Sequence, residues 1–456
     1  MEIIEISGIR IQPAEVFERV FKDKPFPFLL ESGIRHPEFG RYSIMGCEPF
    51  LRFKSKGRKI EIIENGRAHN LTGNPFNCLK DLFHRFKRSI NSRFLPFTGG
   101  AVGYFAYDLG AHIEKLPDIA VDDINLPDCY LCFYKNVFLI DHIQNKCFII
   151  GNKAGEISKS LNKNIKFKKY NIPSQKMTKK LGKSGRLNSN FTYSGYIKAI
   201  NKAKYYISCG DIYQVNLSQR FMCQIETTPF EVYKRLRHIN PAPFSAFLDY
   251  GDFSVVSSSP ERFLRVRDGI VQTRPIKGTR PRGRTPSEDR RLAGELLKSE
   301  KDRAELVMIV DLERNDLGRV CEYGSVRVKE LVALEKYPTV FHTVATVEGK
   351  LYRGKDIIDL LKATFPGGSI TGAPKIRAME IIEELEPTKR SIYTGAIGYI
   401  SFEGNMDLNI VIRTFILKGN TAYFQAGGGI VADSQPEAEY QETLDKAKAL
   451  IETATG

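Results

Sequence analysis

A lysine and a glutamate near the middle of the chain have the residue types and spacing for nucleophilic chemistry. Lys277 follows the β-rich run 273–276 and precedes a Gly-Thr turn, and Glu261 lies 16 positions earlier. A lysine attacks only when unprotonated, a state favoured by removal from water and by neighbouring cations such as Arg274 and Arg280. The glutamate would supply a proton. A strand-end lysine in solvent is the alternative that spacing alone leaves open.

Two pairs of acidic residues occur at helical spacing. Asp302 and Glu305 are three positions apart, and so are Glu439 and Glu442. Such pairs share a helix face. Magnesium is usually bound by one or two carboxylates together with water and substrate oxygens, so two converging helices could form its site. Solvent-facing acids are the alternative for either pair, although Glu305 precedes an apolar run that makes burial plausible.

Glycine clusters, an arginine and a histidine complete the candidate set. The segments 367–375 and 427–431 can bring backbone N–H groups against a carboxylate or phosphate, but neither has the Gly-Lys-Ser/Thr end of a P-loop. Arg413 is expected to be a cation in an apolar strand, able to clamp a carboxylate or to pair with a structural acid. His342 lies among apolar residues, where a hydrogen-bonded core histidine is the common case.

The order of elements predicts an α+β fold with large sheets. Short strands and turns fill residues 1–152, a lysine-rich linker follows at 153–190, and strands alternate with helices over 191–456. One long helix is expected from Ser287 through Leu306. The spacing of Ser434 and Glu437 predicts a capping box that opens a final helix.

Charge and composition limit the function classes. The net charge of +15 raises a nucleic-acid hypothesis, but the lysines concentrate in the linker, where a solvated surface explains them, and a basic field also suits a small anionic substrate. The N-terminus lacks the features of a signal peptide, and no apolar run is long enough to span a bilayer, so we expect a cytoplasmic protein. The scattered cysteines are expected to be reduced thiols.

The motifs taken together resemble the chorismate-utilising enzymes, a family that includes the anthranilate, aminodeoxychorismate, isochorismate and salicylate synthases. The resemblance covers nearly the whole chain and is strongest between residues 210 and 448. It rests on the segments Gly210–Ser218, Ser259–Arg262, Asp302–Glu305, Val310–Asp316, Gly372–Lys375 and Glu439–Glu442.

The resemblance implies a sandwich of antiparallel-rich sheets flanked by helices, with a magnesium-dependent chorismate site. Glu305 and Glu442 match the family's magnesium ligands, with Glu439 and Asp302 beside them. The implied substrate-binding residues are Gly278, Thr279, Tyr393, Arg413, Gly427, Gly428, Gly429 and Gln214. Alanine is common in the family at the position of Gly428, a departure expected to matter little.

Three positions indicate a branch of the family. Isochorismate and salicylate synthases have a lysine base where this chain has Gln214, which disfavours activation of water. Lys277 and Ala242 resemble aminodeoxychorismate synthase component I, whereas anthranilate synthases usually have alanine and serine there. The segment Leu29–Ser32 resembles the one that binds tryptophan as a feedback inhibitor in anthranilate synthases, and it does not decide between the branches.

The resemblance therefore implies amination of chorismate to 4-amino-4-deoxychorismate, for para-aminobenzoate and folate synthesis. Glu261 would be the general acid and Lys277 the covalent nucleophile, with His342 near the reacting ring. Cys209 lacks the setting of a glutamine-hydrolysing cysteine, so a separate amidotransferase subunit is the expected partner and source of ammonia. Anthranilate synthase component I is the alternative enzyme, and a basic nucleic-acid-binding protein is the alternative of another class.

Overall fold

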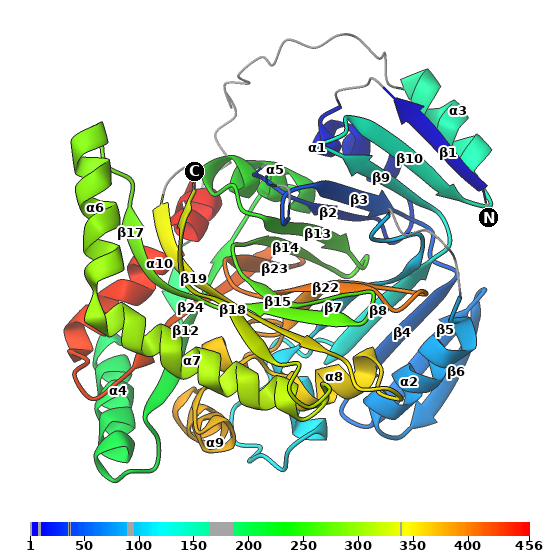
Figure 1. Ribbon diagram of the computed structural model, residues 1–456. Helices are drawn as coiled ribbons and strands as arrows, with labels where there is room; N and C mark the ends of the chain where they lie inside the picture. Colours follow the sequence, from blue (N-terminus) through cyan, green and yellow to red (C-terminus); the bar gives the residue numbers. More distant parts are fainter. Residues whose placement is uncertain are drawn as a thin grey trace.

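Two large antiparallel sheets pack face to face and carry helices on their outer surfaces (Figure 1). The structure is a computed structural model that describes residues 2–7, 11–34, 36, 38–88, 95–164, 186–337 and 340–456. The predicted α+β class, with its helix-flanked sandwich, is confirmed.

The first sheet has 12 strands, of which 11 follow one another and β20 pairs separately with β12. In spatial order its strands are β1 (Glu2–Ser7), β10 (Lys146–Gly151), β9 (Val137–Asp141), β3 (Tyr42–Gly46), β2 (Phe28–Glu31), β13 (Phe244–Asp249), β14 (Phe253–Ser259), β23 (Thr414–Lys418), β24 (Thr421–Ile430), β12 (Gln214–Gln224) and β11 (Asn188–Ser189), with β20 at Gly372–Ala373.

The second sheet also has 12 strands, and β18 pairs with β19 off the main path. In spatial order they are β17 (Ile276–Pro281), β19 (Val340–Lys350), β16 (Ile270–Arg274), β15 (Arg262–Arg267), β22 (Met406–Ile410), β21 (Ala396–Ser401), β7 (Gly100–Phe105), β8 (Cys129–Tyr134), β4 (Leu51–Lys56), β5 (Lys59–Glu64) and β6 (Arg67–Thr72), with β18 at Arg327–Lys336.

The helices cover the outer faces of both sheets, as Figure 1 shows. They are α1 (Pro13–Val16), the π-helix η1 (Phe17–Phe21), α2 (Pro75–Phe86), the 3₁₀ helix η2 (Tyr107–His112), α3 (Ala154–Asn164), α4 (Tyr193–Ser208), α5 (Pro229–Ile239), α6 (Pro286–Lys298), α7 (Glu300–Gly318), α8 (Ile357–Thr364), the 3₁₀ helix η3 (Gly368–Ile370), α9 (Lys375–Leu385) and α10 (Pro436–Thr455).

Two helix predictions were wrong in detail. The single helix expected from Ser287 through Leu306 is two helices, because the Ser299 hydroxyl accepts a hydrogen bond from the Asp302 N–H (3.3 Å) and thereby caps the second one. The capping box expected at Ser434 does not form. Helix α10 begins after Gln435 without a side-chain cap, and the Ser434 hydroxyl donates instead to the Glu439 carboxylate (2.6 Å).

Aromatic and aliphatic side chains from both sheets fill the space between them. Tyr104 and Tyr130 of the second sheet pack in one buried cluster with Ala246 and Val255 of the first. Separate clusters lie between each sheet and its outer helices. The sandwich therefore has three apolar layers, which hold both sheets against each other and against the helices.

Both sheets combine strands from the N-terminal and C-terminal parts of the sequence. Strand β2 pairs with β13 in the first sheet, and β7 pairs with β21 in the second. Strands on both sides of residues 152 and 191 therefore share each sheet. The predicted division of the chain into an N-terminal subdomain, a linker and a catalytic domain stays a prediction. Helix α3 occupies the beginning of the expected linker, and the linker residues 165–185 lie outside the described ones.

The chain passes from one sheet to the other twice at the same place. Strand β14 ends at Ser259 and β15 begins at Arg262, while β22 ends at Ile410 and β23 begins at Thr414. The strands pair on each side, β14 with β23 and β15 with β22, so the two crossings run side by side. The Arg262 guanidinium binds the Asp407 carboxylate through two hydrogen bonds, of 2.9 and 3.0 Å, just beyond them.

Among the described residues, no helix combines the length and the apolar character required to cross a membrane.

Close contact between β7 and β8 requires glycine at position 103. A Cβ atom there would lie 2.0 Å from the Tyr130 carbonyl oxygen, a backbone atom that cannot move aside. We therefore expect Gly103→Ala to lower the free energy of unfolding by about 1–3 kcal/mol or more, measured by denaturant titration. Gly294→Ala in α6 is the control, because its Cβ meets nothing within 4 Å and should stabilise the helix slightly. Equal unfolding midpoints for the two variants would contradict this account.

Candidate active site

Glu261 occupies the first crossing between the sheets and is buried there, with 6% of its surface exposed. The Ser369 hydroxyl donates to its Oε1 (2.7 Å). Burial raises the pKa of Glu261, against the opposing effects of the Ser369 hydrogen bond and the Lys277 charge. A carboxyl group whose pKa is raised in this way is suited to donate a proton as a general acid.

Lys277 lies in β17, one residue before a bulge. The register with β19 shifts between Lys277 and Thr279, and Gly278 has the left-handed φ of 74° that this irregularity requires. The Lys277 ammonium nitrogen lies 3.5 Å from the Ser369 carbonyl oxygen, so lysine and glutamate meet at the same serine. Burial lowers the pKa of Lys277, although the Glu305 carboxylate works against that effect. The solvent-exposed alternative is therefore excluded.

His342 is buried on β19, and its Nδ1 lies 2.9 Å from the Thr279 hydroxyl. Burial, with the Arg413 charge second, lowers the pKa of His342 to about 3. The ring is neutral near pH 7 and is a poor proton acceptor there. The His342 ring is therefore suited to hydrogen bonding rather than to general base catalysis.

Arg413 lies on the second crossing rather than inside an apolar strand, which corrects the sequence prediction. Its φ of 51° is left-handed, a strained conformation for a residue with a side chain. The guanidinium donates to the Asn240 amide oxygen (3.2 Å), and no acidic side chain within the described part of the chain pairs with it. Burial lowers the pKa of Arg413. A half-buried cation without a carboxylate partner is suited to bind an anionic ligand.

Tyr393 lies in the turn that connects α9 to β21. The Arg390 guanidinium carbon is 5.8 Å from the centre of its ring. Burial raises the pKa of Tyr393, so its hydroxyl stays protonated and can act as a hydrogen-bond donor.

The three glycines of β24 contact different parts of the site. A Cβ on Gly428 would lie 3.3 Å from the Glu442 Oε1 and 3.4 Å from the Glu439 Oε2, so both carboxylates converge on this glycine. The family's common alanine would lie in close contact with both carboxylates, and the expectation that this difference matters little stays a prediction. The Gly427 carbonyl accepts a hydrogen bond from Lys446 (3.0 Å).

Gln214 packs against Gly429, whose added Cβ would lie 1.9 Å from the amide nitrogen. The side chain is fully buried, and neither its nitrogen nor its oxygen has a hydrogen-bond partner among the described residues. A buried amide without partners is costly unless a ligand satisfies it.

The four predicted acids lie on α7 and α10. The negative charges of Glu305 and Glu442 both favour the protonated form of Lys277 and so act to raise its pKa. Glu439 is buried, and burial raises the pKa of its carboxyl group. Burial tends to raise the pKa of Glu442, but the Lys446 charge reverses the shift and holds it below its usual value. Asp302 forms an ion pair with Arg280 (3.1 Å) beside Gly278.

Sequence reasoning missed two residues of this site. Lys446 pairs with Glu442 (2.7 Å) and helps to lower the pKa of Lys277. Ser369 contacts both Glu261 and Lys277. Lys446 lies one helical turn after Glu442, a spacing that could have revealed it, whereas Ser369 gave no signal beyond its glycine-rich surroundings.

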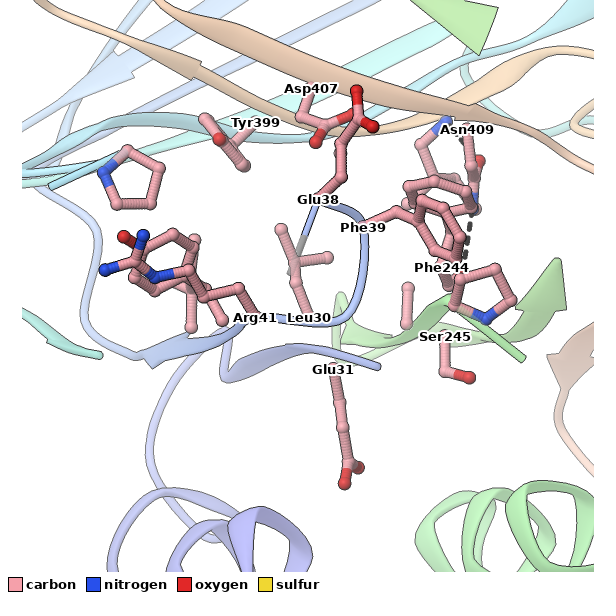
Figure 2. Close-up of a pocket in the computed structure, with 17 residues that line it drawn as sticks. Leu30, Glu31, Glu38, Phe39, Arg41, Phe244, Ser245, Tyr399, Asp407 and Asn409 are labelled. Atoms are coloured by element: carbon pink, nitrogen blue, oxygen red, sulfur yellow. Dashed lines mark hydrogen bonds between the residues drawn. The ribbon is translucent and has the colours of Figure 1, made fainter. Parts of the chain in front are cut away.

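A cavity of about 90 Å³ lies between the sheets, apart from the predicted site residues (Figure 2). Leu30 and Glu31, from the segment that resembles a tryptophan site, are among its lining residues. Figure 2 shows the Glu31 carboxylate directed away from the cavity, and it is bound there by Arg237 (2.6 Å) and Tyr233 (2.8 Å).

Comparison with known proteins gives consistent matches. The family model described as chorismate binding enzyme matches residues 36–452. Anthranilate synthase component 1 of Acetivibrio thermocellus is 44% identical over 98% of this chain and 94% of its own length. Aminodeoxychorismate synthase component 1 of Bacillus subtilis is 40% identical over 95% of this chain and 93% of its own.

A solved structure extends the match to three dimensions. Anthranilate synthase component I from Streptococcus pneumoniae superposes with a TM-score of 0.79 and 36% identity, over 91% of this chain and 93% of that one. The family resemblance read from the motifs is confirmed. This chain therefore belongs to the family of chorismate-binding enzymes.

Proposed function

We propose that this protein is the synthase component of an aminodeoxychorismate synthase, which converts chorismate and ammonia to 4-amino-4-deoxychorismate. The observation that carries the proposal is the Lys277 amine, whose pKa burial lowers and which lies at the same serine as the Glu261 carboxyl. Anthranilate synthesis needs no amine nucleophile at this point, so the lysine favours the two-step route.

The proposed reaction consists of two displacements with allylic shift. Glu261 gives its proton to the C4 hydroxyl of chorismate, which leaves as water while the neutral Lys277 amine bonds to C2. Ammonia then attacks C4, the double bond shifts back, and the lysine leaves. The covalent intermediate divides a difficult substitution into two easier ones and places the new nitrogen at C4.

Substrate binding in this proposal relies on a cation without an acidic partner and on several polar groups. Arg413 would bind a substrate carboxylate, and the Tyr393 hydroxyl, the Gly427–Gly429 backbone and the His342–Thr279 pair would surround the ring. The support is that the Arg413 guanidinium donates to the Asn240 amide oxygen but has no acidic partner among the described residues, and that the Gln214 amide has no hydrogen-bond partner there. An amide neither takes nor gives a proton near pH 7, so Gln214 would orient a nucleophile without activating water.

The donor set fits magnesium as a cofactor. Within the described ranges no group of three or more His, Cys, Asp or Glu side chains could hold a metal. Magnesium, however, normally takes only one or two protein carboxylates, with water and substrate oxygens completing its shell. Glu305 and Glu442 would hold it, with Glu439 supporting Glu442 beside Gly428. The bound ion would neutralise the ring carboxylate of the substrate.

A separate amidotransferase subunit is the proposed source of ammonia, with free ammonium as its substitute. The support is that the relatives described above are each named as a component 1. Anthranilate synthase component 1 is the alternative function, because one of those relatives and the superposed structure carry that name.

Replacement of the lysine should change the product. With chorismate, magnesium and ammonium, we expect the native protein to form 4-amino-4-deoxychorismate and Lys277→Ala to lose that product, forming the C2-aminated precursor of anthranilate instead. Chromatography with mass spectrometry identifies the products. Lys336→Ala, at an exposed lysine of the same sheet, is the control and should match the native protein. Anthranilate from the native protein would establish the alternative.

Removal of Glu305 should weaken the binding of magnesium. In Glu305→Ala, we expect the half-saturating magnesium concentration to rise by roughly tenfold or more, because a direct ligand is lost. Magnesium titration of the steady-state rate measures it. Glu300→Gln, at an exposed acid of the same helix, should leave the titration unchanged. An unaltered titration in Glu305→Ala would remove this residue from the metal site.

A further inference from the structure

We propose that Ser369 is a positioning residue that holds the proton donor and the nucleophile in a fixed relation and stabilises the Glu261 carboxylate as it forms. This rests on the function proposed above. Ser369 is buried, with 6% of its surface exposed. Its hydroxyl donates to Glu261, and its carbonyl accepts from Lys277 (3.5 Å) and from the Asn216 amide (3.2 Å). One residue therefore contacts both reacting groups through different atoms.

The short helix η3 that carries Ser369 is fixed from several sides. A Cβ on Gly368 would lie 2.7 Å from the Leu312 side chain, and one on Gly367 would lie 2.9 Å from the Ile410 side chain. Helix α7 and the start of the second crossing therefore pack closely against η3 and the residue before it. The Thr371 hydroxyl donates to the Gly367 carbonyl (3.0 Å).

A buried ion pair anchors the other end of η3. Arg390 and Glu386 are each 2% exposed at their side chains, and two hydrogen bonds join them. The same guanidinium donates to the Ile370 carbonyl (3.0 Å) and to the Asn216 carbonyl (2.7 Å). Ser369 therefore lies next to a backbone carbonyl that a buried arginine holds, and its hydroxyl needs no rearrangement to reach Glu261.

The hydroxyl contributes most once the proton has left Glu261. A hydrogen bond to a carboxylate is about twice as strong as one to a neutral acid, so the contact strengthens as charge develops. An interaction that is stronger in the transition state than in the ground state raises kcat rather than lowering KM. The charged or titratable groups that face Glu261 are Lys277 on β17, Lys446 on α10 and Glu313 on α7.

The test compares Ser369→Ala and Ser369→Thr with a matched control. Thr364→Val removes another buried hydroxyl, one that donates to the Leu360 carbonyl (2.8 Å). Rates with chorismate, magnesium and ammonium are measured across pH for each full-length variant, together with thermal unfolding. The inflection that belongs to Glu261 is identified as the one that disappears in Glu261→Gln.

For Ser369→Ala we expect kcat to fall by about tenfold or more, with KM for chorismate nearly unchanged. The Glu261 inflection should move to higher pH, because the hydroxyl that favours the ionised carboxyl is gone. Ser369→Thr should restore much of kcat and the inflection, and Thr364→Val should match the native profile.

The proposal is overturned if the Glu261 inflection stays in place in Ser369→Ala, if the loss lies in KM alone, or if Thr364→Val loses as much activity. Failure of the proposed function would instead be visible in the identity of the product. Amination at either C2 or C4 requires protonation of the departing C4 hydroxyl, so the pH profile tests Ser369 whichever product forms.

Discussion

The site depends on the place where two paired strands pass together from one sheet to the other. Glu261 and Arg413 lie on the two crossings, and each crossing supports the other. The Ile410 N–H donates to the Glu261 carbonyl (3.0 Å), the Ser258 N–H donates to the Arg413 carbonyl (3.1 Å), and the Ser259 hydroxyl donates to the Ile410 carbonyl (2.6 Å). Polar side chains can occupy the interior here because the backbone bends away from both ladders while its hydrogen bonds stay satisfied.

Burial and charge act in opposite directions on the two reacting groups, and burial dominates both. The Lys277 pKa falls and the Glu261 pKa rises, although each charged partner favours the ionised form of the other. Desolvation therefore moves the pair toward a neutral amine beside a neutral acid, the protonation state that the proposed chemistry requires. Lys446 assists by adding a second positive charge near the amine.

Sequence patterns predicted the fold class, the family and many of the residues that meet in the site. The same patterns were less successful in predicting where elements end and which hydrogen bonds individual side chains form. Arg413 has apolar neighbours in sequence, a pattern that predicts a strand, but those neighbours end one strand and begin another in the opposite sheet. Ser434 has the spacing of a cap, yet tertiary contact with Glu439 claims its hydroxyl. Ser369 could not be recognised, because its role depends on groups more than 90 positions away in the chain that only folding brings to it.

The interleaving of early and late strands affects how the chain must assemble during synthesis. One edge of β2 and one edge of β7 stay unpaired until residues 244–249 and 396–401 have left the ribosome, since β13 and β21 are their neighbours. Open apolar strand edges invite association with other chains, and distant pairings close slowly. The N-terminal part of the growing chain therefore presents open strand edges until these later residues have been synthesised.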